Sequence, residues 1–241
     1  MLQKTRGIVL KTTNYSESSI VAQIFTEKFG VQSYMVNGVR KTKAKNSANL
    51  FQPLNLLELV VYNKASGGIQ RISEIRNTPV YMNIPFDIVK GSLLMFLNEM
   101  IYKSFKQETE DSQLFEFVFN SIQFLDLYQG NPANFHLLFL IRLSKYLGFY
   151  PDNSYAATSH YFDLKNGVFL KSQPLHPQYI SQPYSNFVAQ LLNIHFEDLE
   201  NLTINAAQRK VLLQALIDFY HLHIDGMGII YSHEVLEEIL R

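Results

Sequence analysis

The 241-residue chain carries 21 basic and 21 acidic side chains, no cysteine, and 47% hydrophobic residues. A chain of this length and apolar content suits one large or two small globular domains. The lack of cysteine excludes disulfides, iron–sulfur clusters, thiolate-ligated zinc and cysteine catalysis, so any metal site would have to use His, Asp and Glu.

No segment predicts a membrane span or a secretion signal. The most apolar helical segment, residues 135–149, is interrupted by Arg142 and Lys145, well short of the roughly 20 apolar residues that a span needs. The apolar stretch near the N-terminus is too brief for a signal peptide. We therefore expect a cytoplasmic protein without membrane contact.

The neutral total hides a charge difference between two parts of the chain. Residues 1–78 hold eleven Lys or Arg and four Glu, whereas residues 79–241 hold ten basic and seventeen acidic side chains. Such asymmetry favours a nucleic acid or another anionic partner for the first part. Ordinary surface variation is the alternative.

The first part has the pattern of short strands, because segments rich in Val, Ile, Tyr and Phe alternate with Gly, Asn, Ser and Lys clusters. The last two strands read as a hairpin, in which Gly67 and Gly68 supply the positive φ of the turn. A basic, aromatic-containing barrel of five strands is typical of an OB-fold, which stacks bases and neutralises phosphates of single strands. The five predicted strands lie within residues 5–15, 18–26, 30–38, 51–63 and 69–76.

After about residue 78 the hydrophobic period becomes helical. Asn205 and Gln208 form a capping box at the start of one predicted helix. Residues 150–183 are rich in Pro, Ser and Asn, with a hairpin whose turn is Asn166–Gly167. The predicted helices lie within residues 86–105, 111–128, 134–149, 206–223 and 232–240.

These patterns together predict an α+β protein in two parts. Residues 1–78 form an OB-fold barrel that binds DNA, and residues 79–241 form an all-α helical domain. Residues 150–183 form a small hairpin-containing insertion in the second part.

No catalytic or metal-binding motif is present. The chain lacks a phosphate loop, and the helix signature beginning at His233 has Glu237 where a zinc protease needs its second histidine. No arrangement of residues suggests a nucleophile with its base. We therefore assign no catalytic residue, no metal ligand and no cofactor.

Several short motifs occur in a fixed order along the chain. Those in the first part are "GIVL" (7–10), "YSESS" (15–19), "TEKFG" (26–30), "NGVRKTKAK" (37–45) and "FQP" (51–53). Two more follow in the helical part, "KYLGFYP" at residues 145–151 and the segment 220–236. This order resembles the bacterial recombination mediator family RecO, and the resemblance covers nearly the whole chain.

The resemblance implies an N-terminal OB-fold, a helical domain and no enzymatic turnover. Members of that family bind single- and double-stranded DNA, anneal strands coated with single-strand-binding protein, and with RecR help to load RecA, so we expect association with the nucleoid. Many relatives hold a structural zinc with four cysteines that this chain lacks. We expect a metal-free hairpin there, held by packing of Tyr161, Phe162, Val168, Phe169 and Leu170.

The predicted DNA contacts centre on a basic loop without acids, formed by Arg40, Lys41, Lys43 and Lys45. Flexible cations of this kind suit sequence-independent binding to phosphates, although the loop could instead be a solvated linker. Tyr34, Phe51 or Tyr62 could stack on bases, but alternation alone does not tell which of them face the barrel interior. The further predicted phosphate contacts are Lys11, Lys64, Arg71 and Arg76.

A protein partner is expected for the acidic helical part, because its net negative charge repels DNA. The family resemblance implies that this part binds the acidic C-terminal tail of single-strand-binding protein, which needs a basic residue beside an apolar pocket. The proposed site is Arg142 or Lys145 beside the helical face of Phe135, Phe139 and Tyr146. Core packing with a snorkelling arginine is the alternative.

Two other functions remain open at this level. An OB-like adaptor would bind protein through its basic loop and show weak DNA binding without preference for single strands. A nuclease would need clustered carboxylates and a divalent ion.

Overall fold

The computed structural model describes residues 2–39, 48–63, 67–105, 110–156 and 158–241. The chain divides into two compact units, Met1–Pro85 with Asn98–Asp126, and Phe86–Leu97 with Leu127–Arg241. The strands of the barrel end at Asn77, close to the expected change of pattern. The unit that contains them also takes in the last seven residues of α1 (Ile88–Ser104) and nearly all of α2 (Ser112–Leu127).

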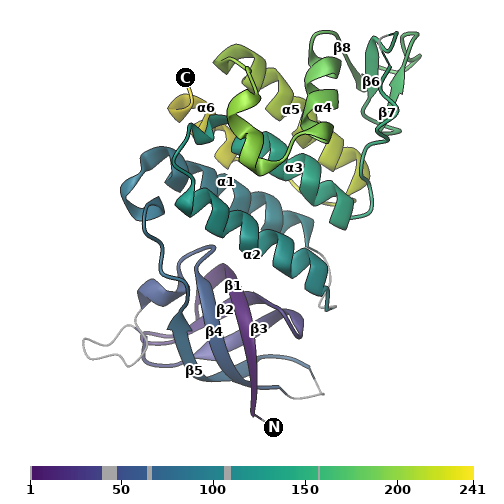
Figure 1. Ribbon diagram of the computed structural model, residues 1–241. Coiled ribbons are helices and arrows are strands. Elements are labelled where there is room, and N and C mark those ends of the chain that lie inside the picture. The colour runs from purple at the N-terminus through teal and green to yellow at the C-terminus, as the bar shows by residue number, and fades with distance from the viewer. Residues whose placement is uncertain (1, 40–47, 64–66, 106–109, 157) are drawn as a thin grey trace. The chain divides into compact units, whose positions relative to one another are not determined.

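The first unit contains a closed barrel with the strand order β1-β2-β3-β5-β4 (Figure 1). β1 pairs antiparallel with both β2 and β4, and β3 runs parallel to β5. This is the five-stranded barrel expected of an OB-fold, and with the helices that follow it confirms the predicted fold class. The strands are β1 (Leu2–Asn14), β2 (Ile20–Thr26), β3 (Gly30–Val36), β4 (Leu56–Tyr62) and β5 (Gln70–Asn77).

The length of β1 explains how one strand closes the barrel. Its first half pairs with β4 and its second half with β2, and a bulge between Val9 and Lys11 lies in its pairing with β2. A bulge bends a strand and increases its twist. A side chain at Gly7 would displace its neighbours, because a Cβ would lie 2.7 Å from Cγ2 of Ile24 and 2.9 Å from Cδ1 of Leu59.

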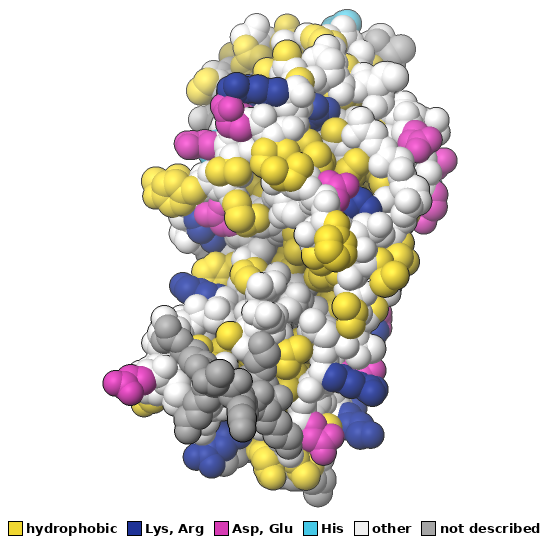
Figure 2. Space-filling view, turned by 90° about the vertical axis from the view of Figure 1, so that its left-hand side faces the viewer, with side chains coloured by type: hydrophobic (Ala, Val, Ile, Leu, Met, Phe, Trp, Pro, Cys, Tyr) yellow, Lys and Arg dark blue, Asp and Glu magenta, His cyan; other side chains and the backbone are white. Residues whose placement is uncertain are grey.

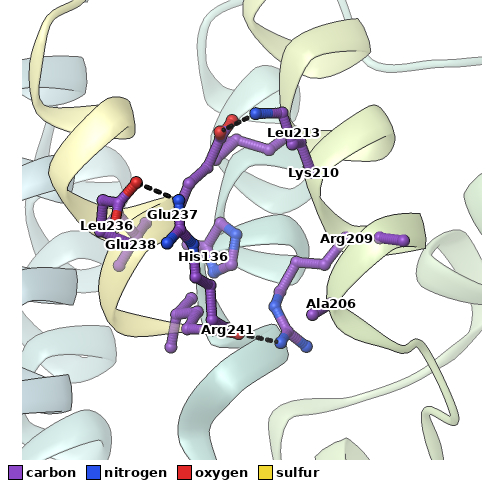
Figure 3. Close-up of a pocket in the computed structure, with 11 residues that line it drawn as sticks. His136, Ala206, Arg209, Lys210, Leu213, Leu236, Glu237, Glu238 and Arg241 are labelled. Carbon is purple, nitrogen blue, oxygen red and sulfur yellow. Dashed lines mark hydrogen bonds and ion pairs between the residues drawn. The ribbon is translucent and has the colours of Figure 1, made fainter.

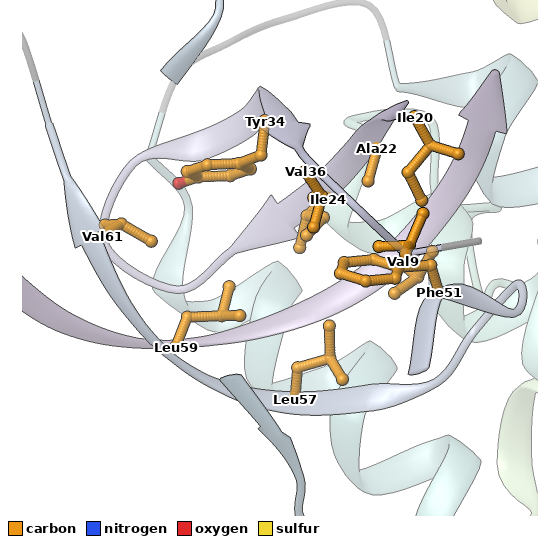
Figure 4. Packing of buried hydrophobic residues seen from close by; sticks show 11 residues of the cluster. Val9, Ile20, Ala22, Ile24, Tyr34, Val36, Phe51, Leu57, Leu59 and Val61 are labelled. Carbon is orange, nitrogen blue, oxygen red and sulfur yellow. The ribbon is translucent and has the colours of Figure 1, made fainter. Parts of the chain in front are cut away.

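Alternate residues of the strands fill the barrel interior (Figure 4). This period of two places one side of each strand in the core and the other side on the barrel surface. The buried cluster consists of Val9, Ile20, Ala22, Ile24, Tyr34, Val36, Val39, Phe51, Leu57, Leu59 and Val61.

Residues of α2 and of the segment just after α1 cover one part of the barrel. The ring of Phe25 packs edge-on against Phe105 and Phe115, with centroids 4.9 and 5.4 Å apart. The buried carboxylate of Asp126 accepts hydrogen bonds from the backbone N–H groups of residues 82–84. This contact fixes the connection that leads from the barrel to α1.

The second unit is organised around α3 (Phe135–Tyr146), most of whose residues are buried, so other elements enclose it. The other helices are α4 (Tyr184–Asn193), α5 (Ala206–His223) and α6 (Ser232–Ile239). The predicted capping box of Asn205 and Gln208 opens α5. The buried hydroxyl of Tyr220 donates to the carbonyl of Leu140 over 2.7 Å and so connects α5 to α3.

A small antiparallel sheet, in the order β7-β6-β8, contains the predicted hairpin. The strands are β6 (Tyr161–Asp163), β7 (Val168–Leu170) and β8 (Tyr179–Ser181). Gly167 has a φ of 67° in the turn. Phe162 and Phe169 are buried, while Tyr161, Val168 and Leu170 are half-buried.

Candidate nucleic-acid interface

The predicted basic loop lies outside the described residues. Arg40, Lys41, Lys43, Lys45 and also Lys64 are therefore still predictions. β3 precedes these five residues in the sequence and β5 follows them. The two strands pair with each other, with Tyr34 and Met35 of β3 beside Gln70 and Arg71 of β5.

The aromatic predictions divide by burial. Tyr34 and Phe51 are 1% and 2% exposed and belong to the barrel core (Figure 4). Their assignment as stacking residues is corrected, because a base cannot reach a ring inside a packed barrel. Tyr62 is 45% exposed and its ring is accessible.

The strand pairings place a continuous row of side chains on the barrel surface. Tyr62 pairs with Leu2 on one side and with Arg71 on the other, and Arg71 pairs with Met35. Paired residues of neighbouring strands point to the same face of a sheet. We call this set the outer row, and it contains Leu2, Tyr62, Arg71, Met35, Val21 and Thr13.

The outer row carries a basic residue and no acid. Arg71 is exposed and makes no ion pair with a described residue. Lys11 lies two residues before Thr13 on the same face of β1, opposite Gln23. Glu17 lies in the turn beyond the end of the row. A single strand could therefore follow this side of the barrel without meeting a carboxylate inside the row.

The next two rows along β1, β4 and β5 mix both charges. Arg76, a predicted DNA contact, pairs with Glu58 on the neighbouring strand through Nε at 2.9 Å and through Nη2. The parallel row carries Lys4, Val60 and Glu74. A groove of about 480 Å³ runs between these rows. Because carboxylates offset its cations, Arg76 is a weaker candidate than Arg71 for a phosphate.

Charge alone does not mark an interface on the face drawn in Figure 2. On the face drawn in Figure 2, basic and acidic side chains are interspersed with hydrophobic ones, and neither sign forms a continuous patch among the described residues. The outer row follows from strand pairing, which the linear sequence does not contain.

Lys11 contacts an aromatic residue that the sequence did not indicate. Its Nζ lies 3.2 Å from the hydroxyl of Tyr102 and 4.9 Å from the centroid of that ring. Tyr102 belongs to α1 and to the same compact unit as the barrel. Helical periodicity gives no signal for this role, since the contact depends on how the helix packs in the unit.

A second cation, Arg6, is held by acids. It bonds Glu27 over 2.9 and 3.0 Å, and it also bonds Glu116 of α2. The guanidinium lies over the rings of Phe115 and Phe119 at 5.3 and 4.9 Å. The bond to Glu27 raises the pKa of Arg6, and Arg6 lowers the pKa of Glu27. Arg6 therefore has a structural role in the first unit and is not a free phosphate contact.

The predicted partner-binding face of α3 is corrected by the structure. Phe135 and Phe139 are fully buried, and their rings stack 6.2 Å apart. Arg142 donates to the hydroxyl of Tyr150 over 3.1 Å and to the carbonyl of Ile194. Only Lys145 is exposed, and Tyr146 is half-buried. The apolar face of this helix is core packing, because Phe135 and Phe139 are enclosed by other elements of the unit.

A pocket of about 200 Å³ lies elsewhere in the second unit, between α5 and α6 (Figure 3). Lys210 forms an ion pair with Glu237 over 2.8 Å, and Arg241 pairs with Glu238. Burial lowers the pKa of His136 to about 3, so its ring is neutral at pH 7. The apolar part of the lining consists of Ala206, Ala207, Leu213, Leu236 and Leu240.

No group of three or more His, Asp or Glu side chains that could hold a metal ion occurs in the described parts of the chain. Within the hairpin, Asp163 accepts hydrogen bonds from the backbone of Lys165 and Asn166 and contacts Nε2 of His176 at 3.2 Å. Among the described helices, none has the length and apolar content needed to cross a membrane.

Comparison with known proteins gives matches along nearly the whole chain. The N-terminal family model of recombination protein O matches residues 1–79, and its C-terminal model matches residues 85–229. A protein named DNA repair protein RecO from Azobacteroides pseudotrichonymphae is 35% identical over 239 residues, 99% of each chain. Proteins of the same name from Phocaeicola vulgatus and Flavobacterium johnsoniae are each 33% identical, over 99% and 98% of each chain. The chain therefore belongs to the RecO family.

Proposed function

We propose that this chain is a non-catalytic DNA-binding mediator of recombinational DNA repair. It binds single- and double-stranded DNA, anneals complementary strands coated with single-strand-binding protein, and with RecR helps to load RecA at the nucleoid. Membership of the RecO family supports the role in repair. The observation that carries the DNA-binding part is the acid-free outer row on an OB-type barrel.

The chemistry of this side favours binding without sequence preference. Lys and Arg side chains neutralise phosphates and release condensed counterions without reading the edges of bases. Arg71 and Lys11 supply two such cations among the described residues. The basic loop, which follows β3 in the sequence, would add Arg40, Lys41, Lys43 and Lys45.

Changing all four loop cations to Ala is expected to weaken DNA binding and its dependence on salt. If the loop engages about four phosphates of a single strand, the slope of log K against log salt becomes shallower by roughly 3. Fluorescence anisotropy of a labelled single strand, titrated at several salt concentrations, measures both quantities.

The matched control changes Lys145, Lys165 and Lys171 to Ala, which are exposed lysines of the second unit. This variant is expected to bind as the unchanged protein does. If the loop variant also binds with the original affinity and slope, the loop is a linker and the proposed contact is wrong.

The acidic tail of single-strand-binding protein is proposed to bind the pocket between α5 and α6. Lys210 and Arg241 supply basic groups beside the apolar walls of Leu213 and Leu236. Both cations already have glutamate partners, so carboxylates of a tail would replace Glu237 and Glu238. This proposal takes the place of the α3 face, whose aromatic residues Phe135 and Phe139 are buried.

Lys210→Glu is expected to lower the affinity for a synthetic peptide of that tail by about tenfold or more, because it replaces an attraction by a repulsion. Titration calorimetry of the peptide measures the loss. Lys145→Glu is the control, since Lys145 is an exposed cation on α3. A loss with Lys145→Glu and none with Lys210→Glu would contradict the pocket assignment.

A further inference from the structure

We infer that Tyr62 with Arg71 and Tyr102 with Lys11 form the two ends of one binding site for single-stranded DNA. Each aromatic ring receives a base and each cation the neighbouring phosphate. The inference rests on the proposed function and adds to it the residues that distinguish single strands from duplex.

The first pair is built by strand register. Tyr62 on β4 is the direct partner of Arg71 on β5, and both side chains are exposed. The Cβ atoms of such partners lie about 4.5–5.5 Å apart. A base stacked on the Tyr62 ring therefore has its phosphate within reach of the Arg71 guanidinium. Leu2, the partner of Tyr62 on β1, is 51% exposed and extends the apolar surface beside the ring.

The second pair is built by α1. The ammonium of Lys11 lies over the Tyr102 ring and donates to its hydroxyl. A cation–π contact at an exposed site is weak, whereas a phosphate offers a full negative charge. A bound phosphate therefore draws Lys11 away from the ring, and the ring face becomes available to a base.

The surface between the pairs is neutral. Met35 and Val21 are half-buried, and Thr13 is exposed at the end of the row. From β4 through β5, β3 and β2 to β1 there are four strand spacings, or about 19 Å along the barrel surface. This span suits a short single strand near the lower end of the roughly 4–16 nucleotides that an OB-fold contacts.

The rings of Tyr62 and Tyr102 make this site selective for single strands. Bases in a duplex are stacked on one another, whereas an unpaired base offers a free face to an aromatic side chain. Cations, by contrast, attract the phosphates of both forms. The two kinds of residue should therefore affect the two forms of DNA differently.

The test compares binding of an oligonucleotide of about eight nucleotides with binding of the same sequence as a duplex. Tyr62→Leu and Tyr102→Leu keep apolar volume but remove the aromatic face. Each is expected to lower single-strand affinity about tenfold and to leave duplex affinity unchanged. Tyr62→Phe and Tyr102→Phe keep the ring and are expected to bind single strands nearly as well as the unchanged protein.

Two controls separate the possible failures. Lys11→Ala and Arg71→Ala are expected to weaken single-strand and duplex binding alike, and Tyr231→Leu, an exposed tyrosine of the second unit, to change neither. If the cation variants act and the Leu variants leave single-strand binding unchanged, or weaken both forms equally, the inference is overturned while the proposed function stands. If the unchanged protein binds neither form of DNA, the proposed function itself fails.

Discussion

Replacing Asp126 by Ala is expected to lower the free energy of unfolding by about 4 kcal/mol, because its buried carboxylate satisfies three backbone donors. The side chain is 3% exposed. It accepts from the N–H groups of Met82, Asn83 and Ile84 over 2.8, 2.9 and 2.8 Å. Without it, the three donors lose their acceptor, and the N–H of Ile84 is left unpaired in a buried position. Urea denaturation followed by circular dichroism measures the change.

The position of Asp126 makes its role specific. Asp126 lies in the last turn of α2, where the helix macrodipole disfavours a negative charge. The hydrogen bonds from the facing N–H groups stabilise that charge instead. Asp126→Asn keeps one acceptor oxygen and is expected to lose about half as much. Asp225→Ala, at an exposed turn, is the control and should stay within about 0.5 kcal/mol. A loss below about 1 kcal/mol in Asp126→Ala would show that the 82–84 connection is held by other contacts.

Arg209→Met is expected to lower the free energy of unfolding by about 3 kcal/mol, since it removes a buried donor that serves three acceptors. Its guanidinium donates to Oδ1 of Asn134 over 3.0 Å and to the carbonyls of Ile204 and Leu240 over 3.2 and 2.7 Å. Burial lowers the pKa of Arg209. Met fills much of the volume of the arginine side chain. The decrease in the free energy of unfolding, measured by thermal or urea unfolding, therefore reflects the three acceptors left without a donor.

The neighbouring Lys210 provides a matched control for Arg209. Its side chain is 69% exposed in an ion pair with Glu237, and Lys210→Met is expected to change stability by less than about 1 kcal/mol. Arg209→Lys should recover only part of the loss, because a single ammonium cannot reproduce the planar fork of donors. Equal stability of Arg209→Met and the unchanged protein would mean that the three acceptors find water or other donors.

The sequence predicted strands and helices well where the hydrophobic period continued over the whole element. All five strands of the barrel, and five of the six α-helices in the described parts of the chain, lie where alternation or helical spacing placed them. α4 and β8 were missed. β8 has three residues and owes its strand form to pairing with β6, and α4 begins directly after Pro183 in a stretch rich in breaking residues.

The sequence predicted the kind of binding site, but only some of the residues that form it. Cation content identified Lys11 and Arg71, and both are exposed, Arg71 in the acid-free outer row and Lys11 two residues before its end at Thr13. Tyr34 and Tyr62 could not be separated by composition, because either side of a half-buried strand can carry an aromatic residue. Phe135 and Phe139 showed the same ambiguity, since an apolar helical face can be a binding surface or core.

The sequence by itself determined the fold class, the family and the charge of the first part. These follow from periodicity, motif order and residue counts, which are local or additive along the chain. Only the tertiary structure decided which aromatic residues are exposed, which acids offset Arg6 and Arg76, and that Tyr102 meets Lys11. Those relations depend on strand register and helix packing, which bring together residues as much as 110 positions apart.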